Sequence, residues 1–404
     1  MELTLAKQAV VEAGIALVKE GLIQRTWGNV SCRVDEERFV ITPSGRDYLS
    51  LTPDDVVLVN IGDLSYEGDI KPSSEKGIHA NCYRLRPDVN FVIHTHQTYA
   101  SIQGMSGFDL NRVPSPYDEL LGDNVPLAAY GLPGTKKLKK GVADALLRSD
   151  SNAVLMFRHG AVCLGKDKEN AFAVARALEG ACELAVKERM REVSGKPAAA
   201  FKEIADYVAQ KLTQSTSIRD YAPFDSVRVF GAAEMTPAGG GETVCIDLST
   251  GMPLDFETDM PETAFLHAEI YNRRQDVQAI CHSKEEATLA ASRTGLTVRP
   301  FLDDFAQIVG LTLPNADYNP SNAKRTAKQV VKKLRRRDAV MLDHNGAICI
   351  GSDKEEAEAV KLVAEKGCKA FLTADLYGKA DDPICVLECA LMRTVYKLKY
   401  SKKK

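Results

Sequence analysis

Residues 160–169 read GAVCLGKDKE, and residues 346–355 read GAICIGSDKE, 186 positions later. A second set of residues matches in the same order at an offset of 188: His79, Tyr83, Arg86, Asp88, Val89 and His94 recur as His267, Tyr271, Arg274, Asp276, Val277 and His282. Two long matches at nearly one offset indicate an internal repeat. A repeat unit of roughly 190 residues is too long for a solenoid, so the sequence predicts a duplicated domain.

Helix-like and strand-like segments alternate within each copy, which favours an α/β layered domain. In the first copy, the apolar pattern predicts helices near residues 2–21, 74–86, 136–148 and 170–193. It predicts strands at 30–34, 39–41, 56–61, 92–95, 153–157 and 162–165. A polar break at Ser194-Gly195-Lys196-Pro197 follows the last helix. We therefore expect two domains, residues 1–197 and 198–404.

Composition excludes several classes of protein. The chain of 404 residues carries 52 Lys and Arg against 55 Asp and Glu, a net charge of −3, whereas nucleic-acid-binding proteins usually carry a basic excess. No apolar run reaches the roughly 18 residues that a membrane span requires. The first 23 residues read as an amphipathic helix, not as a secretory signal. The ten Cys lack a CxxC pair and fit reduced thiols. The sequence thus predicts a cytoplasmic protein with neither a nucleic-acid nor a membrane partner.

Three histidines form a candidate metal site. His94 and His96 flank Thr95 on a predicted strand, and alternate strand residues face the same side. Two imidazoles so placed can chelate one metal, and three with an open position form a catalytic zinc arrangement. His159, at the end of the segment VLMFR, is the candidate third ligand. The alternatives are an ordinary strand edge for the pair and a turn histidine for His159.

Three short segments are candidates for binding phosphate: GNVS (28–31), TPSG (42–45) and PSSE (72–75). The last begins a helix, whose free N–H groups suit phosphate. Glu75 follows its two serines, and a carboxylate beside a metal and a phosphate pocket can act as a general acid or base. Plain turns, helix capping and a dipole-favoured glutamate are the alternatives.

GNVS, TPSG, PSSE, the HTH strand and the FRHG turn (157–160) come in the order and at the spacings of the class II aldolase/adducin family, which the chain resembles over residues 1 to about 195. The resemblance, which is to the fuculose-phosphate aldolase type, implies a three-layer domain: a central, mostly antiparallel sheet flanked by helices. It implies zinc ligation by His94, His96 and His159, and makes Glu75 the catalytic acid/base. The substrate phosphate would lie at Gly28, Asn29, Ser44, Gly45, Ser73 and Ser74.

The resembled family also contains pentulose-phosphate 4-epimerases, β-keto acid phosphate decarboxylases and adducins. The epimerases carry Asp at the position of Glu75, and a Thr-His-Ala-Asp stretch where residues 114–119 here read PSPYDE. Both differences favour an aldolase that cleaves a ketose 1-phosphate to dihydroxyacetone phosphate and an aldehyde. Decarboxylation stays open. The intact site argues against a non-catalytic, adducin-like role. Tyr117 and Tyr130 are the candidates for protonating the leaving aldehyde.

The second copy has lost the candidate site. His282 matches His94, but Lys284 replaces His96, Asn345 replaces His159, and Thr263 replaces Glu75; Pro261 and Glu262 replace the serines, and no counterpart to GNVS is evident. We therefore expect one zinc ion, or another divalent metal, per chain. Because family members form four-fold rings with sites shared between subunits, the resemblance further implies a homodimer that builds a pseudo-four-fold ring, with the degenerate copy completing its neighbour's site.

Overall fold

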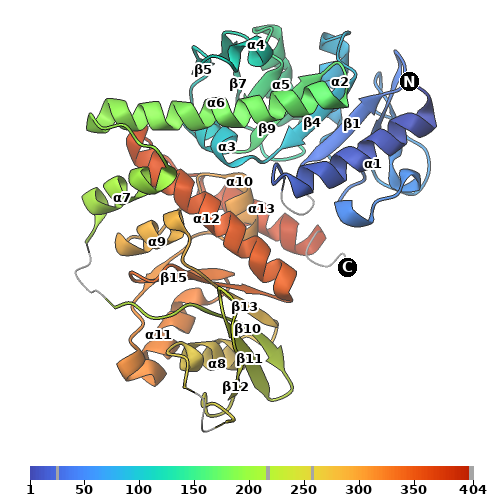
Figure 1. Cartoon of the computed structure of the whole chain (residues 1–404). Coiled ribbons are helices and arrows are strands. Elements are labelled where there is room, and N and C mark those ends of the chain that lie inside the picture. Colours follow the sequence, from blue (N-terminus) through green and yellow to red (C-terminus); the bar gives the residue numbers. More distant parts are fainter. Residues whose placement is uncertain (24–26, 215–218, 256–258, 400–404) are drawn as a thin grey trace. The chain divides into compact units, whose positions relative to one another are not determined.

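The computed structural model describes residues 1–23, 27–214, 219–255 and 259–399. The chain divides into two compact units, one formed chiefly by Met1–Glu192 and the other by Val193–Leu398 (Figure 1).

A seven-stranded sheet forms the middle of the first unit, in the order β3-β2-β1-β4-β9-β8-β7. Its strands are β1 (Asn29–Arg33), β2 (Arg38–Ile41), β3 (Val57–Asn60), β4 (Phe91–Thr95), β7 (Leu127–Ala128), β8 (Ala153–Met156) and β9 (Gly160–Gly165). All neighbours are antiparallel except β7 and β8, which are parallel. Strands β5 (Leu110–Asn111) and β6 (Asn124–Val125) form a separate two-stranded sheet.

Helices cover both faces of this sheet. They are α1 (Leu3–Lys19), α2 (Lys76–Leu85), α3 (Thr98–Met105), α4 (Asp118–Leu121), α5 (Lys136–Leu147) and α6 (Lys168–Ser194), with short 3-10 turns η1 (Tyr48–Ser50) and η2 (Pro53–Asp55). Every residue of β4 and β9 is buried, because these central strands are covered on both faces. Most of these residues are apolar, and the buried polar residues His94 and Thr95 stand at the end of β4.

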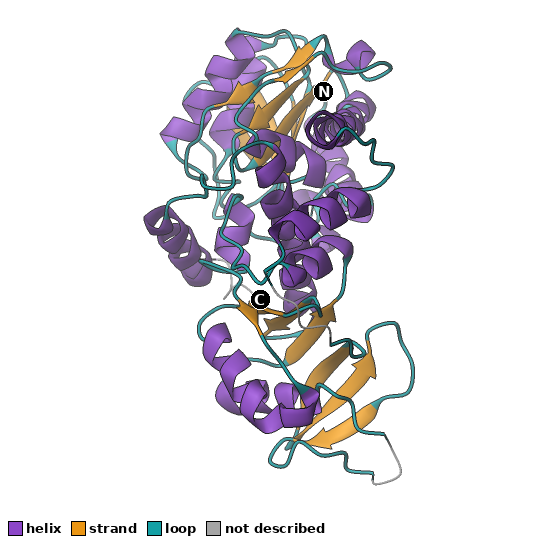
Figure 2. Cartoon of the chain, turned by 90° about the vertical axis from the view of Figure 1, so that its left-hand side faces the viewer, coloured by secondary structure: helices purple, strands orange, loops and turns teal. Residues whose placement is uncertain are grey.

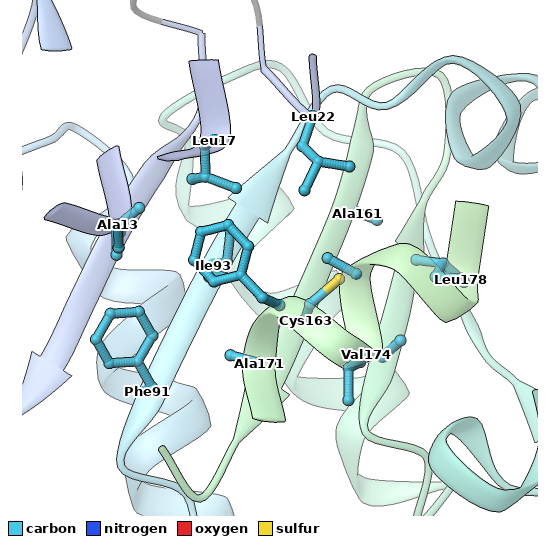
Figure 3. Packing of buried hydrophobic residues seen from close by; sticks show 14 of the residues in the cluster. Ala13, Leu17, Leu22, Phe91, Ile93, Ala161, Cys163, Ala171, Val174 and Leu178 are labelled. Atoms are coloured by element: carbon cyan, nitrogen blue, oxygen red, sulfur yellow. The ribbon is translucent and has the colours of Figure 1, made fainter. Parts of the chain in front are cut away.

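Successive side chains of β4 point to opposite faces of the sheet and contribute to a separate hydrophobic core on each face. Ile93 packs in the cluster that α1 and α6 cover, with Leu17 and Val174 among its members (Figure 3). Val92 belongs to the opposite cluster, which α2 and α5 cover. His94 follows Ile93 and therefore lies on the α2 side, at the end of the strand. The fold thus places His94 at the end of the central strand of the sheet, next to Glu75 at the start of α2.

The second unit repeats this sheet strand for strand, in the order β12-β11-β10-β13-β16-β15-β14. Its strands are β10 (Phe224–Val229), β11 (Ala232–Pro237), β12 (Val244–Asp247), β13 (Ala279–Ser283), β14 (Asn315–Ala316), β15 (Ala339–Leu342) and β16 (Ala347–Gly351). Again only one pair, β14 and β15, is parallel.

Helices flank the second sheet as well (Figure 2). They are α7 (Phe201–Leu212), α8 (Ala264–Arg273), α9 (Glu286–Arg293), α10 (Asp303–Ile308), α11 (Ala323–Leu334), α12 (Lys354–Leu376) and α13 (Val386–Lys399), with the 3-10 turn η3 (Pro320–Asn322). One difference stands out: α1 packs on β1 and β2, whereas α7 packs on α9 and α12. The predicted fold class, two α/β domains with mostly antiparallel sheets flanked by helices, is confirmed.

Across the described residues, no helix combines the length and the apolar character that crossing a lipid bilayer requires.

Candidate active site

Four of the predicted site residues meet at one end of the first sheet. His94 ends β4, His96 follows the strand, His159 lies in the turn between β8 and β9, and Glu75 is the N-cap of α2. Nε2 of His94 lies 3.1 Å from Nε2 of His96. The Glu75 carboxylate lies 3.3 Å from His94 through Oε2 and 3.3 Å from His159 through Oε1. One donor nitrogen from each of the three imidazoles lies within 4.8 Å of the others.

The backbone around this cluster fixes the orientation of His94. Its Nδ1 lies 2.9 Å from the carbonyl oxygen of Ala161, an acceptor only, so Nδ1 carries the proton and Nε2 keeps its lone pair for a metal. Ala161 is brought there by Gly160, which allows β9 to approach β4 closely. A Cβ at Gly160 would lie 2.1 Å from the carbonyl oxygen of Thr95. Glycine is therefore required next to His159 for a steric reason.

Glu75 is a buried carboxylate, with 8 % of its surface exposed. Its burial by itself would raise the pKa of Glu75, but its electrostatic interactions with His94 and His159 and the hydrogen bonds from His159 and Asn29 outweigh the burial and hold that pKa well below its usual range. The carboxylate is thus paired with the same two imidazoles that the sequence predicts as metal ligands.

Asn29 joins β1 to the cluster. It pairs with His94 in the β1–β4 ladder, and its Nδ2 donates to Oε2 of Glu75 at 3.1 Å. The predicted phosphate residue Asn29 therefore contacts the predicted acid/base directly. Gly28, just before it, has φ +123°, and a Cβ there would lie 2.6 Å from the carbonyl oxygen of His94. This conformation and this close approach both favour glycine.

The two serine segments lie side by side, because Pro43 and Pro72 form an isolated antiparallel bridge. The backbone N–H groups of Ser44 and Ser73 are used within this pair of loops. By contrast, the N–H groups of Gly45 and Ser74 make no hydrogen bond to another described residue. These groups stay available to an anionic ligand.

The cluster suits a divalent metal by the chemistry of its donors. Three neutral imidazoles bind zinc and similar ions, and three protein ligands leave a position for substrate. The 3.1 Å approach of two Nε2 atoms is also the kind of convergence that a shared ion would use. His94, His96 and His159 could therefore hold a metal, with Glu75 next to it.

The two candidate tyrosines lie in different surroundings. The Tyr117 hydroxyl lies against Gly180 of α6, so close that a Cβ there would be 2.5 Å from it. Tyr117 thus packs on the sheet face opposite that of His94. The ring of Tyr130 packs edge-on against Phe157, with centroids 6.2 Å apart, two residues before His159.

Three buried residues extend the site into the interior: Ser31, from the GNVS segment, and His79 and Tyr83, which the sequence did not assign to the site. Oγ of Ser31 lies 2.6 Å from Nδ1 of His79 and 2.7 Å from the Tyr83 hydroxyl. Nε2 of His79 bonds Oδ1 of Asn29. The signal was present in the repeat, which retains His79 and Tyr83, and in the four-residue spacing from Glu75 to His79 on one helix face.

In the second unit, the residues at the positions of His94 and His96 form hydrogen bonds within the unit. Nε2 of His282 bonds the carbonyl oxygen of Asn345 at 2.7 Å. Nζ of Lys284 donates to the carbonyl oxygen of Tyr221 at 2.6 Å, and the buried Tyr221 ring lies 6.2 Å from that of His282. His344 has φ +61°, as Arg158 has +64°, so His344 corresponds to Arg158 and not to His159.

One expectation about the second unit is wrong. A counterpart to the GNVS strand exists: β10 contains Ser226, whose Oγ lies 2.8 Å from Nδ1 of His267, as Ser31 bonds His79. Ser31 and His79 are 48 residues apart, whereas Ser226 and His267 are 41 apart. A comparison at constant offset misses β10 because this stretch of the second copy is shorter.

Asp225, Cys281 and Glu358 form another group that could hold a metal, on the face of the second sheet opposite His282. The matching positions in the first unit are the apolar Val30, Ile93 and Phe172. Burial, with the nearby Asp225 and Glu358, raises the pKa of the Cys281 thiol above its usual range, which disfavours the thiolate that binds metals. Glu358 is in turn paired with Lys361 at 3.5 Å. We therefore expect no ion there.

Similarity to known proteins agrees with the geometry. The sequence model of the class II aldolase and adducin N-terminal domain matches residues 8–186 and again 232–372. The 5-deoxy-D-ribulose 1-phosphate aldolase of Bacillus thuringiensis serovar kurstaki is 36 % identical over 174 residues, which are 43 % of this chain and 80 % of that protein.

Two solved structures are also similar. An L-fuculose 1-phosphate aldolase is 29 % identical with a TM-score of 0.44, over 48 % of this chain and 90 % of its own. The L-fuculose-1-phosphate aldolase of Thermus thermophilus is 27 % identical with a TM-score of 0.41, over 48 % of this chain and 98 % of its own. The family match covers most of the sequence and occurs once in each half. The chain therefore belongs to the class II aldolase and adducin N-terminal domain family, as the order of its motifs predicts.

Proposed function

We propose that this protein is a zinc-dependent class II aldolase that cleaves a ketose 1-phosphate into dihydroxyacetone phosphate and an aldehyde. The observation that carries the proposal is the meeting of His94, His96 and His159 with Glu75 at one end of the first sheet. The aldolase relative that is 36 % identical supports the reaction class.

The chain's own residues divide the work. His94, His96 and His159 would hold the metal, and the hydrogen bond from Nδ1 of His94 to the carbonyl oxygen of Ala161 places the lone pair of that ring on Nε2, which faces the cluster. A bound divalent metal supplies Lewis acidity, which stabilises negative charge on the substrate's carbonyl and hydroxyl oxygens when the C3–C4 bond breaks.

Glu75 transfers the proton. Its carboxylate is held beside two of the three imidazoles, within 3.3 Å of each. In this position a protonated Glu75 would deliver its proton to C3 of the dihydroxyacetone phosphate fragment, while the C4 hydroxyl gives up one proton to solvent as the aldehyde forms; solvent then reprotonates Glu75. In the reverse direction the carboxylate removes the proton from C3. A positioned general acid or base of this kind contributes about 10²–10⁴-fold to the rate.

The substrate phosphate binds at the paired serine segments. Ser44 and Ser74 are not buried, and the N–H groups of Gly45 and Ser74 make no hydrogen bond to another described residue. Ser73 is buried and its Oγ accepts from the Glu75 N–H at 3.2 Å, which ties the phosphate site to the acid/base. Gly28 and Asn29 complete the site from the start of β1.

The experiment is a panel of ketose 1-phosphates incubated with zinc-loaded protein and scored for dihydroxyacetone phosphate by a coupled reductase. We expect release of dihydroxyacetone phosphate in equal amount with an aldehyde, and its loss in His96→Ala. Inversion at C4 of a pentulose phosphate, or CO₂ release from a keto-acid phosphate, with no dihydroxyacetone phosphate from any substrate, would overturn the proposal in favour of an epimerase or a decarboxylase.

A further inference from the structure

A chain of buried side chains runs from the interior of the first unit to Glu75. It begins at the Tyr83 hydroxyl, 2.7 Å from Oγ of Ser31, which lies 2.6 Å from Nδ1 of His79. Nε2 of His79 bonds Oδ1 of Asn29, whose Nδ2 lies 3.1 Å from Oε2 of Glu75. All five residues are buried, with at most 8 % of any one exposed.

Each hydrogen bond in this chain has one direction. The carboxylate oxygen of Glu75 accepts, so Asn29 presents its NH₂ group there and its carbonyl oxygen to His79. Nε2 of His79 must therefore carry the proton, and its Nδ1 accepts from the Ser31 hydroxyl. Burial, with nearby His94, lowers the pKa of His79 to about 3 against a smaller opposing effect of Glu75, so the ring is neutral and one tautomer satisfies both bonds.

Comparison with the second unit shows which hydrogen bonds of this series occur in both units and which occur in the first unit alone. Tyr271, Ser226 and His267 repeat the first three members at 2.9 and 2.8 Å. Phe224 then stands where Asn29 stands, two residues before the serine, and Thr263 where Glu75 stands, four before the histidine. Nε2 of His267 has no hydrogen-bond partner among the residues that the structure describes.

The two units therefore share a Tyr–Ser–His link between a strand and a helix, but only the unit with the histidine cluster extends it to a carboxylate. An asparagine amide is nearly symmetric in shape, and its two ends differ only in hydrogen bonding. If His79 did not donate, the Asn29 amide could turn over and present its oxygen to the Glu75 carboxylate, which would push the carboxylate away.

We propose that His79 is a positioning residue: by donating from Nε2 to the Asn29 carbonyl oxygen, it fixes the amide so that Nδ2 holds Glu75 facing His94 and His159. This inference rests on the proposed role of Glu75. It adds a residue that touches neither substrate nor metal and acts through Asn29.

The test uses two substitutions that keep opposite halves of the ring's hydrogen bonding. The amide nitrogen of His79→Gln reaches about as far as Nε2, so the variant keeps the donor toward Asn29. His79→Asn places its amide near Nδ1, so it keeps the contact with Ser31 and loses the donor. His267→Asn makes the latter change in the second unit and is the matched control. For each variant we would measure kcat, KM for a ketose 1-phosphate, bound zinc and the melting temperature.

We expect His79→Asn to lower kcat by about 10- to 100-fold, as loss of an outer-sphere contact typically does. Its zinc content should stay near wild type and its KM should change less than kcat, and His79→Gln should recover most of kcat. His267→Asn should lower the melting temperature by a similar amount while keeping kcat. A normal kcat in His79→Asn, or an equal loss in His267→Asn, would overturn the proposal.

A second measurement needs no substrate. Proton–nitrogen correlation spectra of protein with ¹⁵N-labelled histidine should show His79, identified by its absence in His79→Gln, as a neutral ring protonated at Nε2. Protonation at Nδ1 would overturn the proposal. Wild-type protein that shows the Nε2 tautomer yet releases no dihydroxyacetone phosphate from any ketose 1-phosphate would contradict the proposed function alone.

Discussion

Replacing Glu75 with Gln removes the proposed proton carrier and little else. Glutamine has the same length and nearly the same volume, and its amide oxygen can still accept from Nδ2 of Asn29, which lies 3.1 Å from the carboxylate. Its amide NH₂ would face His159, now 3.3 Å from the other carboxylate oxygen. The substitution should therefore spare the fold and the histidine cluster.

The expected loss follows from the role. A general acid or base contributes about 10²–10⁴-fold, which corresponds to about 2.7–5.4 kcal/mol of activation free energy at 1.36 kcal/mol per tenfold. Loss of one hydrogen bond to a charged group would account for only about 1.5–3 kcal/mol. A fall of kcat beyond about 200-fold is thus more than a rearranged hydrogen bond explains.

The assay is the steady-state rate of dihydroxyacetone phosphate release, with zinc content and melting temperature recorded for the same preparation. Glu262→Gln is the matched control, because this exposed glutamate neighbours Thr263, the residue that replaces Glu75 in the second unit. It should keep full activity. A Glu75→Gln protein with near-normal turnover and normal zinc would refute the assignment and place the proton transfer elsewhere.

Three other predictions concern the metal ligands, the phosphate site and the oligomeric state. His96→Ala should lose bound zinc and activity. Lys284→Ala, at the matching position of the second unit, should keep both. Zinc retained in His96→Ala, measured by elemental analysis, would contradict the proposed ligand set. Ser74→Ala should raise KM for the ketose 1-phosphate by about tenfold or more, as loss of a hydrogen bond to a charged group does, with a smaller change in kcat, and an unchanged KM would remove Ser74 from the phosphate site. If two duplicated chains supply the four domains of a closed ring, as the family resemblance implies, the protein should measure about 88 kDa in light scattering, twice the chain mass of 44.1 kDa. A monomer with full turnover would contradict this assembly.

Local sequence patterns predict much of this site because its chemistry sits where regular structure begins or ends. The two-residue period of a strand places His94 and His96 on one side, and the structure has their Nε2 atoms 3.1 Å apart. His159 was expected at the end of a strand and lies instead in the turn after β8, whose last residue is Met156. The turn still carries it to the cluster because Gly160 lets β9 pair closely with β4.

Contacts set by strand pairing could not be predicted in the same way. The register that places Asn29 opposite His94 joins residues 65 positions apart, and nothing in either segment specifies that alignment. The link from Ser31 to His79 spans 48 residues, and its counterpart in the second unit spans 41. A shortened connection of this kind changes the offset of the repeat without changing the fold. A comparison of the two copies at one offset therefore missed β10, although the second sheet contains this strand.

We propose that the duplicated chain carries one working metal site, in the first unit, and that the second unit keeps the sheet without the ligands. The most direct test is the number of zinc ions bound per chain, measured by elemental analysis of protein saturated with zinc and freed of loosely bound ion. The structure predicts one equivalent per 44.1 kDa chain, lost in His96→Ala. Two equivalents, or one that survives in His96→Ala and disappears in a variant of the second unit such as Cys281→Ala, would contradict the account.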